Sequence, residues 1–249
     1  MNKFIFKAAF AALMALSLQA KEVVVYAAAN TTYAFPELIK KFNTHHKDTQ
    51  IKLTLGSSGA LSTQIRNGAN ADIFLAANMD FVNKLADDGF SETKPVVYAR
   101  GKLALFSLER IALNDGIKSV LNAKSISIAN PKTAPYGTAS IEALKNAKIL
   151  TKVEPKIIYA QKISETLSQA LSAADVGFIA ASALYSPKMT QYKEGVNYIF
   201  INSELYSPID QGIVLLNHAK DSKEAREFYE FLLGDEARAI FAKFGYDLP

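Results

Sequence analysis

The sequence contains no cysteine, which excludes a disulfide framework and any thiolate that could act as a nucleophile or metal ligand. A chain of 249 residues without disulfides has to be held together by its hydrophobic core, which this length permits. The excess of positive over negative charge is also small: the formal net charge is +4, and it is spread along the chain without a polybasic patch. We therefore expect an ordinary globular protein with no nucleic-acid partner.

Histidine, a common metal ligand and catalytic base, is rare in the sequence. The three histidines are His45, His46 and His218, and the adjacent pair lies in a polar stretch that we expect at the surface. Adjacent histidines lack the i, i+4 spacing of a helical zinc pair. The 11 tyrosines include no adjacent pair, which disfavours a transferrin-like iron binder. The sequence thus predicts no resident cofactor and no direct metal-ion ligands.

Long hydrophobic runs are missing after the N-terminal segment. In that segment Lys3 and Lys7 precede an apolar run over residues 8–18, which is followed by Gln19-Ala20 and the charged residues Lys21 and Glu22. The pattern is typical of a secretory signal peptide, and the run is shorter than the roughly 20 residues that a membrane helix needs. We predict a signal peptide over residues 1–20, cleaved near Ala20, and a mature protein exported to the periplasm.

Short β-rich runs alternate with segments of helical spacing through the rest of the chain. Pairs such as Leu61 with Ile65 and Phe81 with Leu85 show the helical spacing. The alternation predicts an α/β fold with mostly parallel sheets that helices flank on both sides. The runs predicted as strands cover residues 22–28, 51–55, 72–76, 103–108, 125–129, 156–160, 176–179, 198–201 and 212–216.

Two segments have the character of crossings between two lobes. One is residues 95–101, which begins at Pro95, and the other is residues 206–208, which ends at Pro208. Two crossings make the second lobe an insertion in the first, with lobe I over residues 21–98 and 210–249 and lobe II over residues 99–209. A single continuous sheet is the alternative that composition leaves open, because neither crossing is a long linker rich in glycine or proline.

Four junctions between a predicted strand and the following helix share small residues, polar side chains and free backbone N–H groups. In open α/β sheets, ligands bind beyond the carboxyl ends of the strands. Each helix start presents unpaired N–H donors and the positive end of the peptide dipole, so several starts around one cleft bind an anion without a formal positive charge. A single Ser, Thr or Asn at a helix start is usually a plain N-cap, and it is the combination that favours an anion site. The junctions cover residues 27–32, 56–59, 130–138 and 160–164.

An ordered set of motifs runs from about Glu22 to the C-terminus. The motifs are Val-Tyr-Ala-Ala-Ala-Asn at 25–30, Gly-Ser-Ser-Gly-Ala-Leu at 56–61, Gly-Ala-Asn-Ala-Asp-Ile-Phe at 68–74, Asn-Pro at 130–131, Pro-Tyr-Gly at 135–137, Val-Gly-Phe-Ile at 176–179 and Phe-Tyr-Glu-Phe-Leu at 228–232. This set resembles the periplasmic molybdate-binding proteins of ABC transporters, the ModA family. The resemblance implies a two-lobed periplasmic binding protein of type II, a monomer without catalytic activity. Such a protein captures molybdate or tungstate in the cleft between its lobes and delivers it to the membrane permease of an ABC importer.

The resemblance also implies which residues hold the oxyanion. By position these are Asn30, Ser58, Tyr136 and Ile163, with Ala29 and Ser57 as secondary candidates. Many relatives carry Ser where Asn30 stands, and a Tyr whose hydroxyl reaches the ligand where this chain has Ala180. The side-chain amide of Asn30, or an extra backbone contact near Tyr136, could substitute for that hydroxyl.

A site that holds only donors fits a fully deprotonated dianion such as molybdate or tungstate. Hydrogen phosphate would leave its own proton without an acceptor, so we expect phosphate to be rejected. Sulfate has the same charge and shape but is smaller, and we expect a rigid cavity to bind it poorly.

Two alternatives come from other classes of function. A hydrolase would use Ser58 as its nucleophile, but residues 56–59 lack the G-x-S-x-G spacing of a nucleophile elbow. A binder of sulfate or of an organic carboxylate is the other alternative, and a carboxylate site would be expected to add an arginine. Arg66, Arg100 and Arg110 lie outside the four junctions, and only Arg100, near the predicted hinge, has a place from which it could reach the cleft.

Overall fold

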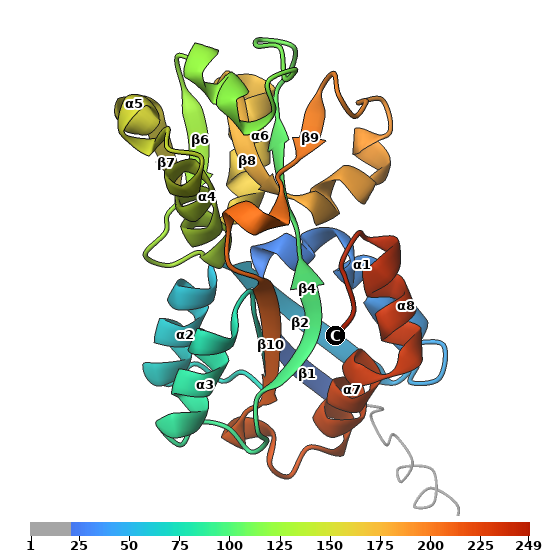
Figure 1. Ribbon diagram of the computed structural model, residues 1–249. Coiled ribbons are helices and arrows are strands. Elements are labelled where there is room, and N and C mark those ends of the chain that lie inside the picture. Colours follow the sequence, from blue (N-terminus) through green and yellow to red (C-terminus); the bar gives the residue numbers. More distant parts are fainter. Residues whose placement is uncertain (1–20) are drawn as a thin grey trace, which may run out of the picture.

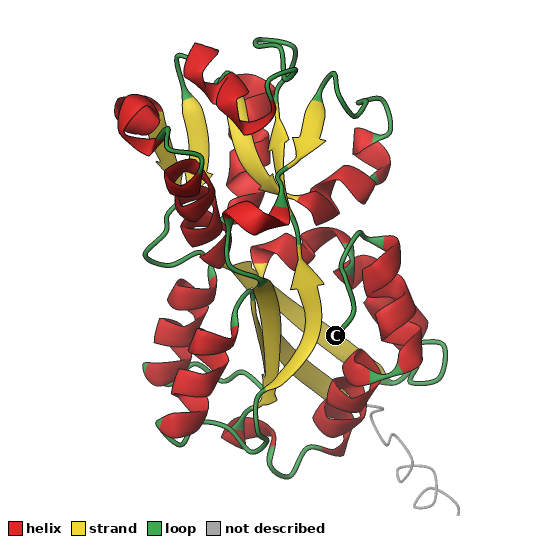
Figure 2. Ribbon diagram, in the orientation of Figure 1, coloured by secondary structure: helices red, strands yellow, loops and turns green. Residues whose placement is uncertain are grey.

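The computed structural model describes residues 21–249, which form two lobes joined by two crossing segments (Figure 1). The predicted signal peptide lies outside the described residues. The two-lobed α/β prediction is confirmed, since each lobe holds one five-stranded sheet with helices on both of its faces (Figure 2). Within the described residues, no helix combines the length and the apolar character needed to cross a membrane.

Lobe I contains both ends of the described chain and a sheet of strand order β2-β1-β3-β10-β4. Strand β3 shows how this sheet is buried, because Ile73 and Leu75 pack into the core under α1, α7 and α8, while Phe74 packs into the core under α2 and α3. The strands are β1 (Lys21–Ala28), β2 (Thr49–Gly56), β3 (Ile73–Ala76), β4 (Val96–Gly101) and β10 (Ile209–Leu215), and the helices are η1 (Ala29–Tyr33), α1 (Phe35–Phe42), α2 (Ser58–Arg66), α3 (Met79–Asp87), η7 (Asn217–Ala219), α7 (Lys223–Leu233) and α8 (Asp235–Lys243).

Lobe II has a sheet of strand order β7-β6-β8-β5-β9. Its central strands are also buried on both faces, since Leu103 and Leu105 belong to one core cluster and Phe106 to the opposite one. The strands are β5 (Leu103–Phe106), β6 (Ile126–Ala129), β7 (Ile157–Ala160), β8 (Val176–Ala180) and β9 (Tyr198–Phe200), and the helices are η2 (Gly116–Asn122), α4 (Pro135–Asn146), α5 (Leu150–Val153), η3 (Glu154–Lys156), α6 (Ile163–Ser172), η4 (Ala181–Tyr185), η5 (Pro187–Met189) and η6 (Ser203–Leu205).

The sheets are mixed rather than mostly parallel. In lobe I, β1 pairs in parallel with β2 and β3, but β10 pairs antiparallel with β3 and β4. In lobe II, β6 pairs in parallel with β7 and β8, but β5 pairs antiparallel with β8 and β9. The physical reason lies in the crossings: β5 and β10 each enter a lobe from the other lobe, so they run against the strands whose carboxyl ends face the cleft.

The chain passes between the sheets at two places. It leaves the lobe I sheet at Gly101 and enters the lobe II sheet at Leu103, so only Lys102 separates β4 from β5. It returns between Phe200 and Ile209. Residues 96–101, interpreted from the sequence as part of a connection, form the edge strand β4. The predicted lobe boundaries, after residues 98 and 209, stay a prediction. In the structure the chain passes from one sheet to the other at Lys102 and again within residues 201–208.

Candidate functional site

All six residues predicted for the site line one cavity between the lobes. Its volume is only about 10 Å³, roughly the room of one water molecule, so the cavity suits a small ion rather than a drug-sized ligand. Lobe I and lobe II both contribute to its wall. The lining residues are Ala28, Ala29, Asn30, Gly56, Ser57, Ser58, Ala77, Ala134, Pro135, Tyr136 and Ile163.

The cavity wall is built from the starts of four helices. Ser58 and Ile163 are the first residues of α2 and α6, while Asn30 and Tyr136 are the second residues of η1 and α4. Each helix follows a strand whose carboxyl end faces the cleft, which is why local sequence patterns found these positions. Backbone N–H groups in the first turn of a helix have no intrahelical acceptor, so the four starts bring donors and positive dipole ends to one place.

The Ser58 side chain is arranged as a hydrogen-bond donor. Ser58 is buried, and its Oγ accepts a hydrogen bond from the backbone N–H of Ala77 at 2.9 Å. Because that bond uses a lone pair of the hydroxyl oxygen, the hydroxyl proton is still available to donate to a ligand. Ser57 is the N-cap residue of α2, and its side chain makes no capping hydrogen bond.

Asn30 is fixed by a buried network within lobe I. Its Nδ2 donates to Gln211 Oε1 at 2.7 Å and to the Tyr246 hydroxyl at 2.9 Å, which uses both amide hydrogens. The Tyr246 hydroxyl in turn donates to the Asn30 carbonyl oxygen at 2.9 Å. The side-chain amide of Asn30 therefore has other acceptors than a ligand, which favours its backbone N–H as the group offered to the cavity. Its Oδ1 is buried without a hydrogen-bond partner among the described residues.

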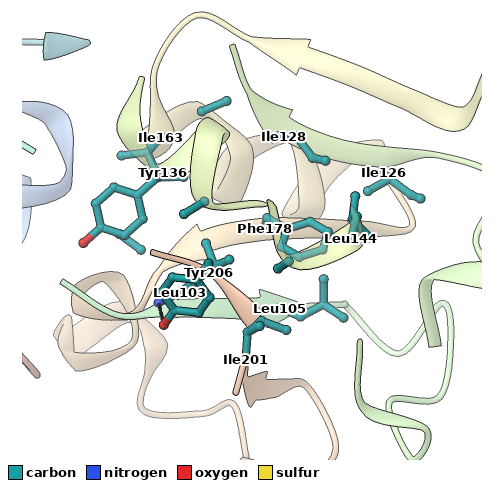
Figure 3. Close-up of a cluster of buried hydrophobic side chains, with 14 of the residues drawn as sticks. Leu103, Leu105, Ile126, Ile128, Tyr136, Leu144, Ile163, Phe178, Ile201 and Tyr206 are labelled. Atoms are coloured by element: carbon teal, nitrogen blue, oxygen red, sulfur yellow. Dashed lines mark hydrogen bonds between the residues drawn. The ribbon is translucent and has the colours of Figure 1, made fainter. Parts of the chain in front are cut away.

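Tyr136 and Ile163 bring the core of lobe II to the cavity (Figure 3). Both side chains belong to the same buried cluster, so the helix starts that they occupy are anchored by hydrophobic packing. Burial raises the pKa of the Tyr136 hydroxyl well above the ordinary tyrosine value, and nearby tyrosines raise it further. Tyr136 thus stays neutral at physiological pH.

No charged side chain lines this cavity within residues 21–249. Arg66 pairs with Asp88, and Arg100 pairs with Asp210 at 2.5 Å and lines a separate groove at the hinge. Arg110 donates to carbonyl oxygens at the C-terminal end of α6, among them that of Ala174 at 2.5 Å, and so complements that end of the helix dipole. An anion in this cavity is therefore held by neutral donors.

Two of the three histidines, His46 and His218, have structural partners away from the cavity. His46 stacks on Phe42 with ring centroids 4.0 Å apart, and His218 Nδ1 lies 2.7 Å from Asp72 Oδ1. The described part of the chain holds no group of three or more His, Cys, Asp or Glu side chains placed to bind a metal ion.

Three contacts join the lobes around the cavity, and each involves a lining residue or its neighbour. The Gly59 N–H donates to the Thr133 carbonyl oxygen at 2.9 Å, next to Ser58 and Ala134. Ser182 Oγ donates to the Asn30 carbonyl oxygen at 2.8 Å. Gln211 Nε2 donates to the Tyr136 hydroxyl at 3.3 Å. These contacts enclose the cavity only when the lobes are together.

Sequence patterns did not identify three buried residues that hydrogen-bond to lining residues but do not line the cavity themselves. Gln211 and Tyr246 lie in strand β10 and in the C-terminal segment, away from any strand-to-helix junction. Ser182 is the second residue of the 3-10 helix η4 that follows β8, a junction that the sequence prediction did not include. Ala180, the position at which we expect this chain to depart from the family's pattern, ends β8 and is not among the residues that line the cavity. The signals in the sequence were weak: Gln211 precedes the apolar run Ile213–Leu215, and Ser182 follows the apolar strand β8.

Known proteins resemble this chain over nearly its whole length. Residues 23–247 match the model of a family described as bacterial extracellular solute-binding protein. The molybdate-binding protein ModA of Azotobacter vinelandii is 34% identical over 244 residues, which cover 96% of this chain and 94% of the relative. ModA of Rhodobacter capsulatus is 33% identical over 236 residues, covering 94% and 91%. The structure of the Azotobacter vinelandii periplasmic molybdate-binding protein matches with a TM-score of 0.82 at 30% identity and covers 91% of this chain and 99% of that one.

Proposed function

The chain belongs to the bacterial extracellular solute-binding proteins, and we propose that it captures molybdate or tungstate between its two lobes for an ABC importer. The observation that carries the proposal is the small cavity walled by four helix starts, two from each lobe, with no charged side chain in its described lining. Such a cavity is suited to a small anion, and its described lining contains no carboxylate, histidine or cysteine that would favour a metal cation.

The donor set favours a fully deprotonated tetrahedral dianion. The Ser58 hydroxyl and the first-turn N–H groups at Asn30, Tyr136 and Ile163 are donors, and within residues 21–249 no carboxylate that could accept a proton from the ligand lines the cavity. Hydrogen phosphate has a proton that needs an acceptor, so we expect it to bind more weakly than molybdate. Size decides among the dianions. We expect similar affinities for molybdate and tungstate, which are alike in size, and weaker binding of the smaller sulfate in a rigid cavity.

Capture and delivery follow from the interlobe contacts. With donors on both lobes, an anion favours the conformation in which the lobes meet, which is hinge closure around a ligand. We propose that the closed form is what a membrane permease recognises, and that the protein acts as a monomer in the periplasm without catalysing a reaction. The relatives named above support this role.

A calorimetric titration of residues 21–249 with molybdate, tungstate, sulfate and phosphate tests the proposal. We expect tight binding of the first two and weak binding of the others. Binding of sulfate or of an organic carboxylate in preference to molybdate would replace the proposed ligand, and absence of heat with every anion would overturn anion capture altogether.

A further inference from the structure

We propose that Gln211, which does not line the cavity, positions the anion site by joining Asn30 of lobe I to Tyr136 of lobe II. This inference rests on the proposed function. Gln211 is fully buried in β10 and contacts a cavity residue of each lobe, because its Oε1 accepts from Asn30 Nδ2 at 2.7 Å and its Nε2 donates to the Tyr136 hydroxyl at 3.3 Å.

The local backbone places Gln211 for this role. Where β10 pairs with β4, the register shifts between Gln211 and Gly212, and Tyr98 of β4 is left without a partner in the ladder. Such a bulge bends a strand and redirects its side chains. The Tyr98 hydroxyl donates to Gln211 Oε1 at 2.9 Å, so the glutamine oxygen has two donors within lobe I. With its oxygen held in this way, the Gln211 amide group is left to donate toward lobe II.

The backbone of β4 leaves space for the contact between the lobes. A Cβ atom at Gly101 would lie 2.1 Å from the Tyr136 hydroxyl oxygen and 2.7 Å from Gln211 Nε2, so a larger residue there would displace both. Gly101 directly precedes Lys102, where the chain crosses to lobe II. The contact between Gln211 and Tyr136 thus joins the two lobes beside the hinge, and the proposal is that it is lost when the lobes separate.

Two consequences distinguish positioning from plain structural support. First, Gln211→Met should lower the stability of the ligand-free protein as well as anion binding, because it also leaves Asn30 and Tyr98 of lobe I unpaired. Tyr136→Phe removes only the bond between the lobes, so it should weaken anion binding with little change in ligand-free stability. Second, the loss of binding should depend on the Tyr136 hydroxyl. If Gln211 acts through Tyr136, removing both groups weakens binding little more than removing Gln211 alone.

The test compares molybdate affinity and ligand-free melting temperature for Gln211→Met, Tyr136→Phe and the double variant. Gln169→Met is the matched control, because Gln169 Oε1 accepts from Ser127 Oγ at 2.5 Å within lobe II only. We expect about tenfold weaker binding for Gln211→Met, as for a buried hydrogen bond lost with its partner left unpaired. We expect weakened binding also for Tyr136→Phe, a double variant close to Gln211→Met, and unchanged affinity for Gln169→Met.

The outcomes separate this inference from the proposed function. If the unmodified protein binds molybdate and Gln211→Met binds it equally well, or if the two single losses simply add, positioning by Gln211 is wrong while anion capture stands. If the unmodified protein binds no anion, both fall. Should Gln211→Met not fold, Tyr136→Phe still decides, because wild-type affinity in that variant would overturn the role of the contact.

Discussion

The substitution Gly59→Ala should weaken anion binding by acting on the closed arrangement of the lobes alone. A Cβ atom at Gly59 would lie 3.0 Å from Thr133 Cα and 3.2 Å from Thr133 Cβ, both in lobe II, and 3.1 Å from the tip of Phe81 in lobe I. The Phe81 ring can turn aside. The Thr133 backbone can move only if the lobes separate, which also strains the hydrogen bond from the Gly59 N–H to the Thr133 carbonyl oxygen.

The size of this effect follows from overpacking. Extra methyl groups in packed interiors cost about 1–3 kcal/mol, which corresponds to about 5- to 150-fold weaker binding. With the lobes apart, alanine near the start of α2 costs nothing of this kind and reduces the freedom of the unfolded chain, so the ligand-free melting temperature should stay level or rise slightly.

Calorimetry with molybdate and thermal unfolding without it measure the two quantities. Gly234→Ala is the matched control, since a Cβ there would lie 3.4 Å from its nearest neighbour, the Phe231 carbonyl oxygen, away from the cleft. Wild-type affinity in Gly59→Ala would refute the argument that the Thr133 contact forms part of closure. A large drop in the ligand-free melting temperature would show instead that the clash exists before the anion binds.

Three further predictions concern the donors and the buried tyrosines. Ser58→Ala removes a donor to a charged ligand and should weaken molybdate binding by about 10- to 150-fold in calorimetry, whereas Ser62→Ala, a buried serine of the same helix outside the cavity, should not. Molybdate affinity should be nearly constant between about pH 6 and pH 9, because no charged side chain lines the cavity and burial raises the pKa of Tyr136; a tenfold change would point to a titrating group at the site. Burial raises the pKa of Tyr246 from 10.0 to about 12, so the unfolded chain releases this proton first and stability falls as the pH rises from 10 to 12. The loss attributable to Tyr246 should be about 3 kcal/mol in denaturant unfolding and absent in Tyr246→Phe.

The parts of the site that the sequence predicts are those that local rules position. Ser58 and Ile163 follow a strand and open a helix, and such junctions gather at one edge of a sheet whatever the rest of the fold does. Local patterns therefore gave the four junctions, and the resemblance to the family selected within them the six residues that line one cavity.

The parts that escaped prediction depend on contacts between distant segments. Gln211 meets Asn30 and Tyr136 only because β10 returns from lobe II beside β4, with a bulge at Tyr98. Strand direction also leaves no trace in periodicity. The period of two is the same for a parallel and an antiparallel strand, so the alternation of strands and helices predicts mostly parallel sheets and does not reveal that β5 and β10 are antiparallel. Pro95 favours a connection over residues 95–101, and the pairing that makes residues 96–101 a strand is a long-range contact with β10.

The arrangement of the cavity links capture of the anion to closure of the lobes. Ser58 lines the cavity, and the next residue, Gly59, bonds to Thr133 of the other lobe. The carbonyl oxygen of Asn30 accepts a hydrogen bond from Ser182 across the cleft, and the hydroxyl of Tyr136 accepts one from Gln211.

The same short segments therefore carry the donors for the ligand and the contacts between the lobes. A shift that opens the interlobe contacts must also disperse the donors, and an anion that orders the donors must bring the contacts into register. In such a site, selectivity among anions of equal charge depends on the separation at which the lobes meet, because the donors of one lobe keep fixed positions relative to one another and only the distance between the two sets can change.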